Sequence, residues 1–180
     1  MVDIILKEVS SFAFKKHYGQ IRPNKKKEPK TVHINQVAAL VKKAKGSLNA
    51  IAAAYLHDTV EDTDTTLEEI CENFGNEVTI LVNELTDPLE FKAMELSIRK
   101  QKQAARIQSA HNDTKIVKIA DQISNVASVY TDPPSDWNNE TCLKYAMGAK
   151  KIVDCCTGAN QYLEDKFNII YMLCITKYSI

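Results

Sequence analysis

The stretch AAYLHDTVED, residues 53–62, decides how this chain of 180 residues is interpreted. It continues an apolar run that begins at Leu48, and it contains four groups that bind metals or handle protons, which are His57, Asp58, Glu61 and Asp62. Residues three and four apart share a helix face, so these groups gather at the end of a hydrophobic helix. Burying carboxylates without a cation is costly, and a divalent metal offsets that cost. The stretch therefore predicts a metal-dependent hydrolase.

Helical periodicity continues on both sides of this stretch, and strand-like alternation is hard to find before residue 167. The helix over 48–57 is apolar almost all round, which is typical of a helix at the centre of a domain. We expect an all-α helical bundle in which 59–64 is an acidic loop. The expected helices cover residues 4–18, 32–45, 48–57, 66–74, 76–86, 89–108, 115–130 and 139–166.

The chain is long enough to bury a core without disulfides or a structural metal, and it predicts one hydrolase domain over 1–166. Residues 167–180 form an apolar tail, for which we expect an irregular or strand-like structure that packs on the domain or on a partner subunit. The tail has fourteen residues and contains Lys177, so it is too short to span a bilayer. A homo-oligomer is compatible with this tail, and a membrane protein is not expected.

Charge and cysteine content narrow the function further. Lysine plus arginine and aspartate plus glutamate number 23 each, so the global basic field of a nucleic-acid binder is missing. Four lysines within residues 25–30 form a basic stretch, which is either a solvated loop or a site for an anionic ligand. The five cysteines include no CxxC pair, and the first ten residues do not resemble a signal peptide, so we expect a cytoplasmic protein.

Two further residues complete a ligand set. Taken alone, His33 would be an exposed histidine at a helix start and Asp121 an ordinary surface carboxylate, just as His57 and Asp58 could form a helix-end ion pair. Together they supply two imidazoles and two carboxylates, which suit manganese, iron or zinc. A structural zinc site is not expected, because no pair of cysteine ligands lies nearby.

The order H…HD…D in a helical chain resembles the HD superfamily of metal-dependent phosphohydrolases. The finer motifs resemble the hydrolase domain of RelA/SpoT homologs and its small single-domain Mesh-type members. This resemblance covers about residues 4–166. It rests on the motifs HYGQIR at 17–22, HINQVA at 33–38, AAYLHDTVEDT at 53–63, FGNEVTILVNELTD at 74–87, KIVKIADQISNV at 115–126 and GANQYLE at 158–164.

The resemblance implies a role for each matching position. Glu61 and Asp62 would be the acidic pair that handles the attacking water. The metal, usually manganese with iron or zinc as alternatives, would be held by His33, His57, Asp58 and Asp121. The nucleotide or its phosphates would be contacted by Arg22, Lys118, Asn125 and Tyr145, with Arg99 as a further candidate.

The chain departs from the family pattern around the expected nucleotide. Pro23 stands where a lysine usually follows the arginine, and Lys30 replaces a tyrosine three residues before the first metal histidine. Thr141 replaces an arginine that is common in the small homologs. The lysines at 25–27 or at 30 are alternative sources of phosphate contacts, because a lysine is a mobile point charge.

From these observations we expect hydrolysis of guanosine tetra- or pentaphosphate at the 3′-position, which releases pyrophosphate and leaves GDP or GTP. One alternative keeps the metal site and changes the substrate to NADPH or another phosphorylated or cyclic nucleotide. A second alternative is a nucleotide sensor without catalysis. The implied partner is a guanine nucleotide.

Overall fold

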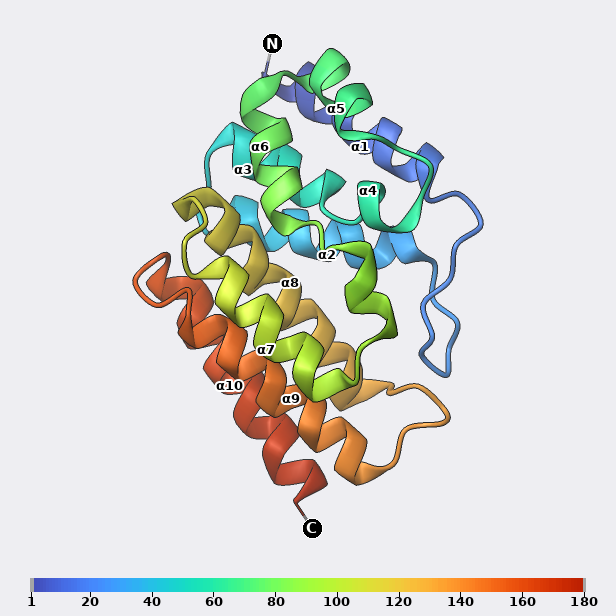
Figure 1. The fold of residues 1–180 in the computed structure, drawn as a ribbon, viewed down its shortest axis with the longest axis vertical. Helices are drawn as coiled ribbons and strands as arrows, with labels where there is room; N and C mark the ends of the chain where they lie inside the picture. The colour runs from blue at the N-terminus through green and yellow to red at the C-terminus, as the bar shows by residue number, and fades with distance from the viewer. Residues whose placement is uncertain (1, 180) are drawn as a thin grey trace.

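The computed structural model describes residues 2–179, which fold into helices joined by short loops (Figure 1). Within this range no strand forms, and the only bridges between extended segments are the isolated pairs Ile21–Pro29 and Asn24–Pro134. The expected all-α fold is confirmed. The elements are α1 (Val2–Lys16), α2 (Lys30–Lys43), α3 (Leu48–Leu56), α4 (Thr59–Asp62), α5 (Leu67–Phe74), α6 (Asn76–Leu85), the 3-10 helix η1 (Leu89–Ala93), α7 (Leu96–Ile107), α8 (Asn112–Thr131), α9 (Asn139–Asp154) and α10 (Gln161–Tyr178).

Helix α3 lies at the centre of one half of the molecule, as its composition predicts. Ser47 caps its first turn, where the hydroxyl accepts a hydrogen bond from the Ala50 amide at 3.0 Å. Six of its nine residues are buried, and α1, α2, α6 and α8 pack around it. Because most of these side chains are alanines, neighbouring helices can approach closely. His57 follows directly after this helix and is therefore inside the protein.

Helix α8 connects this half to the other. It packs against α2, α3 and α6 on one side and against α9 and α10 on the other. Figure 1 shows α7, α8, α9 and α10 lying along one another, with α1 at one end of the long axis and the end of α10 at the other. The middle of α8, which carries Asp121, is thereby held next to α2 and α3.

Helices α1 and α2 each lie two residues earlier than expected, and three other segments also differ from the sequence expectation. The acidic segment 59–64 is a loop only after Asp62, because Thr59 to Asp62 form the single turn α4, in which the Thr59 hydroxyl donates to the Leu56 carbonyl at 2.6 Å. Residues 89–108 are not one helix, since Met94 and Glu95 are extended, with ψ near 149° and 143°, between η1 and α7. Helix α8 begins at Asn112, just before the expected start.

The C-terminal region differs more strongly. The expected single helix 139–166 is broken at Gly158, which has a φ of 90°, and Asn160 caps the new helix α10. The expectation of an irregular or strand-like tail is wrong up to Tyr178, because α10 runs through the expected boundary at 166/167. Phe167 and Cys174 are fully buried, and the Tyr178 hydroxyl donates to the Val129 carbonyl at 2.6 Å. Packing on α8 and α9 thus outweighs the strand propensity of this segment.

No helix between residues 2 and 179 combines the length and the apolar character that a membrane crossing requires.

Candidate active site

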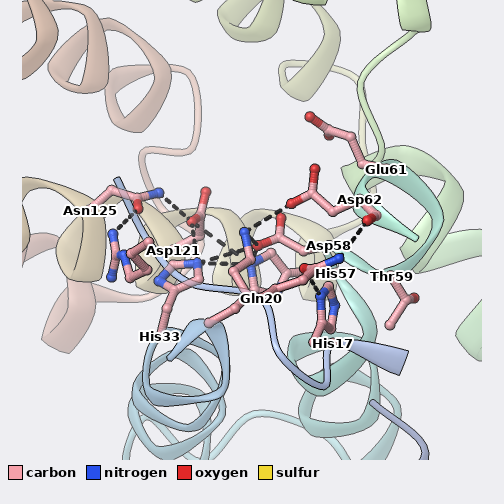
Figure 2. A network of polar contacts seen from close by, with 12 residues as sticks. His17, Gln20, His33, His57, Asp58, Thr59, Glu61, Asp62, Asp121 and Asn125 are labelled. Carbon is pink, nitrogen blue, oxygen red and sulfur yellow. Dashed lines mark hydrogen bonds and ion pairs between the residues drawn. The ribbon is translucent and has the colours of Figure 1, made fainter. Parts of the chain in front are cut away.

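The four predicted metal ligands meet where three helices converge (Figure 2). His33 lies in the first turn of α2, His57 and Asp58 lie between α3 and α4, and Asp121 lies in the middle of α8. The two imidazoles face each other with their Nε2 atoms 3.2 Å apart. Both histidines and Asp121 are buried, so the cluster is inside the protein and not on its surface.

The two carboxylates approach the same point. Asp58 Oδ2 is 3.2 Å from His57 Nε2 and 3.6 Å from His33 Nε2. Asp121 Oδ1 is 3.4 Å from His33 Nε2 and 3.9 Å from His57 Nε2. Neighbouring donors that each lie about 2.1 Å from one ion are separated by about 3.0–3.4 Å. The donor atoms of His33, His57 and Asp58 lie close enough together to hold a single metal ion, and Asp121 Oδ1 lies within 4 Å of both imidazoles.

Hydrogen bonds on the far side of each ring fix the orientation of the imidazoles. His57 Nδ1 donates to the Ala54 carbonyl at 2.8 Å. The Ser124 hydroxyl donates to Gln36 at 2.8 Å, which leaves its oxygen to accept from His33 Nδ1 at 2.9 Å. Each Nε2 atom is then left with its lone pair directed at the other ring. Two lone pairs at this distance repel unless a proton or a metal cation lies between them, and two imidazoles with neighbouring carboxylates are a donor set that fits a divalent metal.

Burial and charge shift the pKa values of these groups in different directions. Burial lowers the pKa of His33 and keeps this imidazole neutral. Burial opposes ionisation of Asp121, but nearby positive charge, including the Lys118 ammonium, holds the pKa of this carboxyl well below its ordinary value. At His57 burial is opposed by the carboxylates of Asp58 and Asp121, which together raise the pKa, so a proton competes with a metal there.

A second layer of side chains holds Asp121. Gln122 Nε2 donates to Asp121 Oδ2 at 2.7 Å, and Asn125 Nδ2 donates to Asp121 Oδ1 at 2.6 Å. Lys118, one turn earlier on α8, has its Nζ 3.7 Å from Oδ2. Arg22 donates to Asn125 Oδ1 at 2.9 Å, which connects the loop after α1 to the ligand. The expected common face of Lys118, Asp121 and Asn125 is confirmed.

The cluster lies between two adjoining cavities, which we call the outer and the inner chamber. The outer chamber has a volume of about 680 Å³, within the range of small-molecule sites, and the inner chamber has about 180 Å³. Six residues line both chambers and so mark the passage between them. They are Lys30, His33, Asp62, Arg99, Asn125 and Tyr145.

The outer chamber combines aromatic and cationic side chains. Trp137 and Tyr145 form one wall with their ring centres 5.2 Å apart, and Arg22 lies on the same lining. Tyr145 is held from behind by Lys100, whose Nζ is 4.2 Å from the ring centre. An aromatic wall beside a guanidinium is suited to a planar base with attached phosphates.

Glu61 and Asp62 line the inner chamber beside the ligands, as Figure 2 shows. Glu61 Oε2 accepts from the Asp87 amide at 3.2 Å, and burial raises the pKa of the Glu61 carboxyl. Asp62 Oδ2 accepts from Lys30 Nζ at 2.9 Å, and the same ammonium lies 2.6 Å from Asp58 Oδ2. Both carboxylates are thus free of the ligand cluster but adjacent to it.

All residues selected from the sequence border one of the two chambers, apart from the loop lysines. Lys25, Lys26 and Lys27 are exposed and line neither chamber, whereas Lys30 lines both. Sequence reasoning missed Ser124, Gln122 and Lys100. Only Lys100 carries a visible signal, because it interrupts the buried stripe that Ala104 and Ile107 continue on α7.

A helical bundle with two histidines and two aspartates at the junction of three helices defines a metal-dependent hydrolase of the HD type. The chain belongs to the HD domain family, whose model matches residues 11–147. Within that family the resemblance to the small Mesh-type proteins is confirmed by the following similarities.

The chain is 34% identical to the guanosine-3′,5′-bis(diphosphate) 3′-pyrophosphohydrolase MESH1 of Xenopus tropicalis, over 93% of each chain. It is 33% identical to MESH1 of Homo sapiens, over 92% of each chain. Its fold matches the solved structure of a metazoan ortholog of SpoT that hydrolyses ppGpp, with a TM-score of 0.85 and 31% identity over 93% of this chain and 94% of that one.

Proposed function

We propose that this protein hydrolyses guanosine 3′,5′-bis(diphosphate), and the corresponding pentaphosphate, at the 3′-position. The observation that supports this most directly is the pair of facing imidazole Nε2 atoms, 3.2 Å apart, at the floor of a chamber that suits a nucleotide. The similarity to MESH1 proteins over nearly the whole chain supports the same substrate. The reaction gives pyrophosphate and GDP from the tetraphosphate, or GTP from the pentaphosphate.

The proposed metal ligands are His33, His57, Asp58 and Asp121, and the proposed metal is manganese, with iron or zinc as alternatives for an N/O donor set. When bound, the ion lowers the pKa of water and offsets phosphate charge. The roles of the remaining residues follow from where their side chains lie.

Binding begins in the outer chamber. The guanine ring packs against Trp137 and Tyr145, while the guanidinium of Arg22 faces the phosphates. Asn125 connects Arg22 to Asp121, so a substrate phosphate held by this arginine lies next to the ligand cluster. Arg99, which lines both chambers, and Lys118, which lines the inner one, offset further phosphate charge.

The chemistry takes place in the inner chamber. Asp62 and Glu61 orient a water molecule and accept its proton as its oxygen attacks the phosphorus atom bonded to the 3′-oxygen. The bond between phosphorus and the 3′-oxygen breaks, and a proton returns to the 3′-oxygen, so that a hydroxyl group is left on the ribose. The Lys30 ammonium holds Asp62 at the edge of the cluster during this step.

Turnover of guanosine tetraphosphate with added manganese, with phosphate and pyrophosphate measured separately, tests the proposal. We expect pyrophosphate as the product and no turnover after treatment with a chelator. Turnover of NADPH to NADH with release of phosphate, and none of the tetraphosphate, would establish the alternative substrate. Pro23, on the wall of the outer chamber where the family has lysine, is the feature that makes this comparison necessary.

A further inference from the structure

Lys100 is a buried cation without a counter-ion. Its side chain extends from α7 into the lining of the inner chamber and is only 4% exposed. Its Nζ donates to the neutral side chain of Gln122 at 3.1 Å and lies over the ring of Tyr145. Among residues 2–179 no carboxylate lies close enough to form an ion pair with it, unlike Lys30 and Lys118 in the same chamber.

Burial of this ammonium is unfavourable unless an anion binds in the chamber. An ammonium taken out of water without an anion costs several kcal/mol, and lysines are rarely buried in this way. Burial accordingly lowers the pKa of Lys100 to about 7. At this position on the buried stripe of α7 an apolar residue would be more stable, so the lysine calls for a functional explanation.

The packing around the lysine accommodates its stem. Helix α9 has Gly148 opposite it, where an added Cβ would lie 2.7 Å from Lys100 Cγ and 2.9 Å from Lys100 Cβ. A glycine inside a helix costs about 1 kcal/mol relative to alanine. The absence of a side chain at 148 therefore lets the lysine reach the chamber between α7 and α9.

The same wall carries a second unpartnered polar atom. Gln103, one turn after Lys100 on α7, has its Oε1 buried without a hydrogen-bond partner. Buried polar groups in folded proteins are normally paired with protein or with water. An ammonium without a counter-ion and a carbonyl oxygen without a hydrogen-bond partner, on neighbouring turns, indicate that this wall faces a polar ligand.

We propose that Lys100 is the phosphate-binding residue at the inner end of the site, where it donates to the terminal phosphate of the substrate's 3′-diphosphate. This inference rests on the proposed function. Lys100 lines the inner chamber but not the outer one, and it lies beyond Tyr145, which lines both. It therefore contacts the part of the substrate that is farthest from the base. The chamber is lined by five carboxylates and five cationic side chains, and a bound divalent ion adds the positive excess that a diphosphate neutralises.

The test compares Lys100→Met with Lys102→Met, an exposed lysine on the same helix. Affinities of the manganese-loaded proteins for inorganic pyrophosphate and for GDP are measured by calorimetry or by the fluorescence of Trp137, the single tryptophan. We expect Lys100→Met to weaken pyrophosphate binding about 10- to 100-fold, the value of a lost charge-assisted hydrogen bond, and to leave GDP binding unchanged. Lys102→Met should bind both ligands as the wild type does.

Three outcomes overturn the inference. Unchanged pyrophosphate affinity in Lys100→Met would show that the ammonium does not meet the phosphate. An equal loss of GDP affinity would show that Lys100 acts by supporting Tyr145. A loss of manganese affinity would show that it acts through Gln122 on Asp121. None of these depends on turnover, so the inference can fail while the wild type still hydrolyses guanosine tetraphosphate.

Two further measurements separate binding from folding. Lys100→Met should unfold at the same or a higher temperature than the wild type without ligand, because it removes an uncompensated buried charge. A lower unfolding temperature would indicate a structural role and overturn the inference. Gly148→Ala keeps the charge but pushes the Lys100 stem aside, and we expect it to weaken pyrophosphate binding by a smaller factor.

Discussion

Arg22 and Asn125, 103 positions apart in the chain, are joined by a hydrogen bond of 2.9 Å, and the same Asn125 side chain donates to Asp121. Arg22, which is proposed to bind the substrate's phosphates, is thus connected through the side chain of Asn125 to Asp121, a proposed metal ligand. The same side chain therefore positions a substrate-binding residue and a metal ligand, which we call the shared support. A change at Asn125 should affect both substrate binding and metal binding.

Asn125→Ala tests this shared support. We expect the KM for guanosine tetraphosphate to rise and the affinity for manganese to fall, each by about 10- to 100-fold, because residues that orient a ligand matter to this extent. Kinetics and manganese titration of the variant provide the measurements. Asn49→Ala, an exposed change on α3, serves as the control. A variant with altered KM and unchanged metal affinity would contradict the shared support.

Manganese should stabilise the folded protein, because it separates the two facing lone pairs of His33 and His57. At a concentration 100 times the Kd, the expected gain in unfolding free energy is about 2.7 kcal/mol, and it is measured as a rise in Tm. His57→Ala should abolish both this rise and turnover. Its circular dichroism should stay helical, since the core of α3 does not need the metal.

The acidic pair should matter for catalysis and not for metal binding. Asp62→Asn and Glu61→Gln are expected to lower kcat by about 10²- to 10⁴-fold, the usual contribution of general acid–base groups. Manganese affinity should change little, because neither carboxylate is one of the four proposed ligands. Single-turnover kinetics on metal-saturated protein make the measurement, and a wild-type rate in both variants would refute the assignment.

The charge of Lys100 gives pyrophosphate binding a pH dependence. Its pKa is lowered to about 7 in the ligand-free protein, so the amine carries its proton below pH 7 and loses it above. Affinity that depends on this proton is complete below pH 7 and falls as the pH rises. Pyrophosphate itself ionises in this pH range and affects both proteins equally, so its contribution cancels in the ratio of wild-type to Lys100→Met affinity. This ratio should decline above pH 7.

Burial is the main cause of the lowered pKa of Lys100, and neighbouring charged groups also affect it. They are Lys118 and Asp121 on α8, Arg99 on α7 and Asp87 after α6, and the neutral ring of Tyr145 on α9 packs against the amine. Bound pyrophosphate adds negative charge and shifts the titration to higher pH. A ratio that stays constant between pH 6 and 9 would show that the lysine does not change charge on binding.

Helix α10 should be part of the folding unit. Phe167→Ala removes a fully buried ring and is expected to cost about 3–5 kcal/mol of unfolding free energy. Met172→Ala, on the exposed face of the same helix, should cost much less. Denaturant unfolding of both variants makes the comparison. Similar midpoints would mean that α10 does not contribute to the stability of the domain, as the expected boundary at 166/167 implies.

The residues selected from the sequence as ligands lie close together in the structure because they occur in short patterns with fixed geometry. His57 and Asp58 follow an apolar helix that has to be buried, and Asp121 and Asn125 share a helix face at a spacing of four. The structure brings these residues together with His33. Their roles as ligands and as bases remain predictions that the experiments above test.

What the sequence could not show depends on tertiary packing. The isoleucines and tyrosines near the C-terminus favour a strand locally, and only the neighbouring α8 and α9 make them helical. The extended Met94 and Glu95 have no glycine or proline to reveal them. The two chambers, and the choice of Lys30 over Lys25 to face them, follow from how the loop after α1 folds back on α2.

The close approach of Lys100 and Gly148 restricts how relatives of this protein can diverge. Any side chain at 148 meets both Cγ and Cβ of Lys100, whereas a residue without a Cγ at 100 removes the closer of these contacts and leaves only the one at Cβ. A lineage that loses the lysine first can then acquire a larger residue at 148, but the reverse order passes through a defective intermediate. Positions 100 and 148 should therefore covary. A descendant with a bulky residue at 148 should lack the lysine at 100 and bind the terminal phosphate of the 3′-diphosphate weakly.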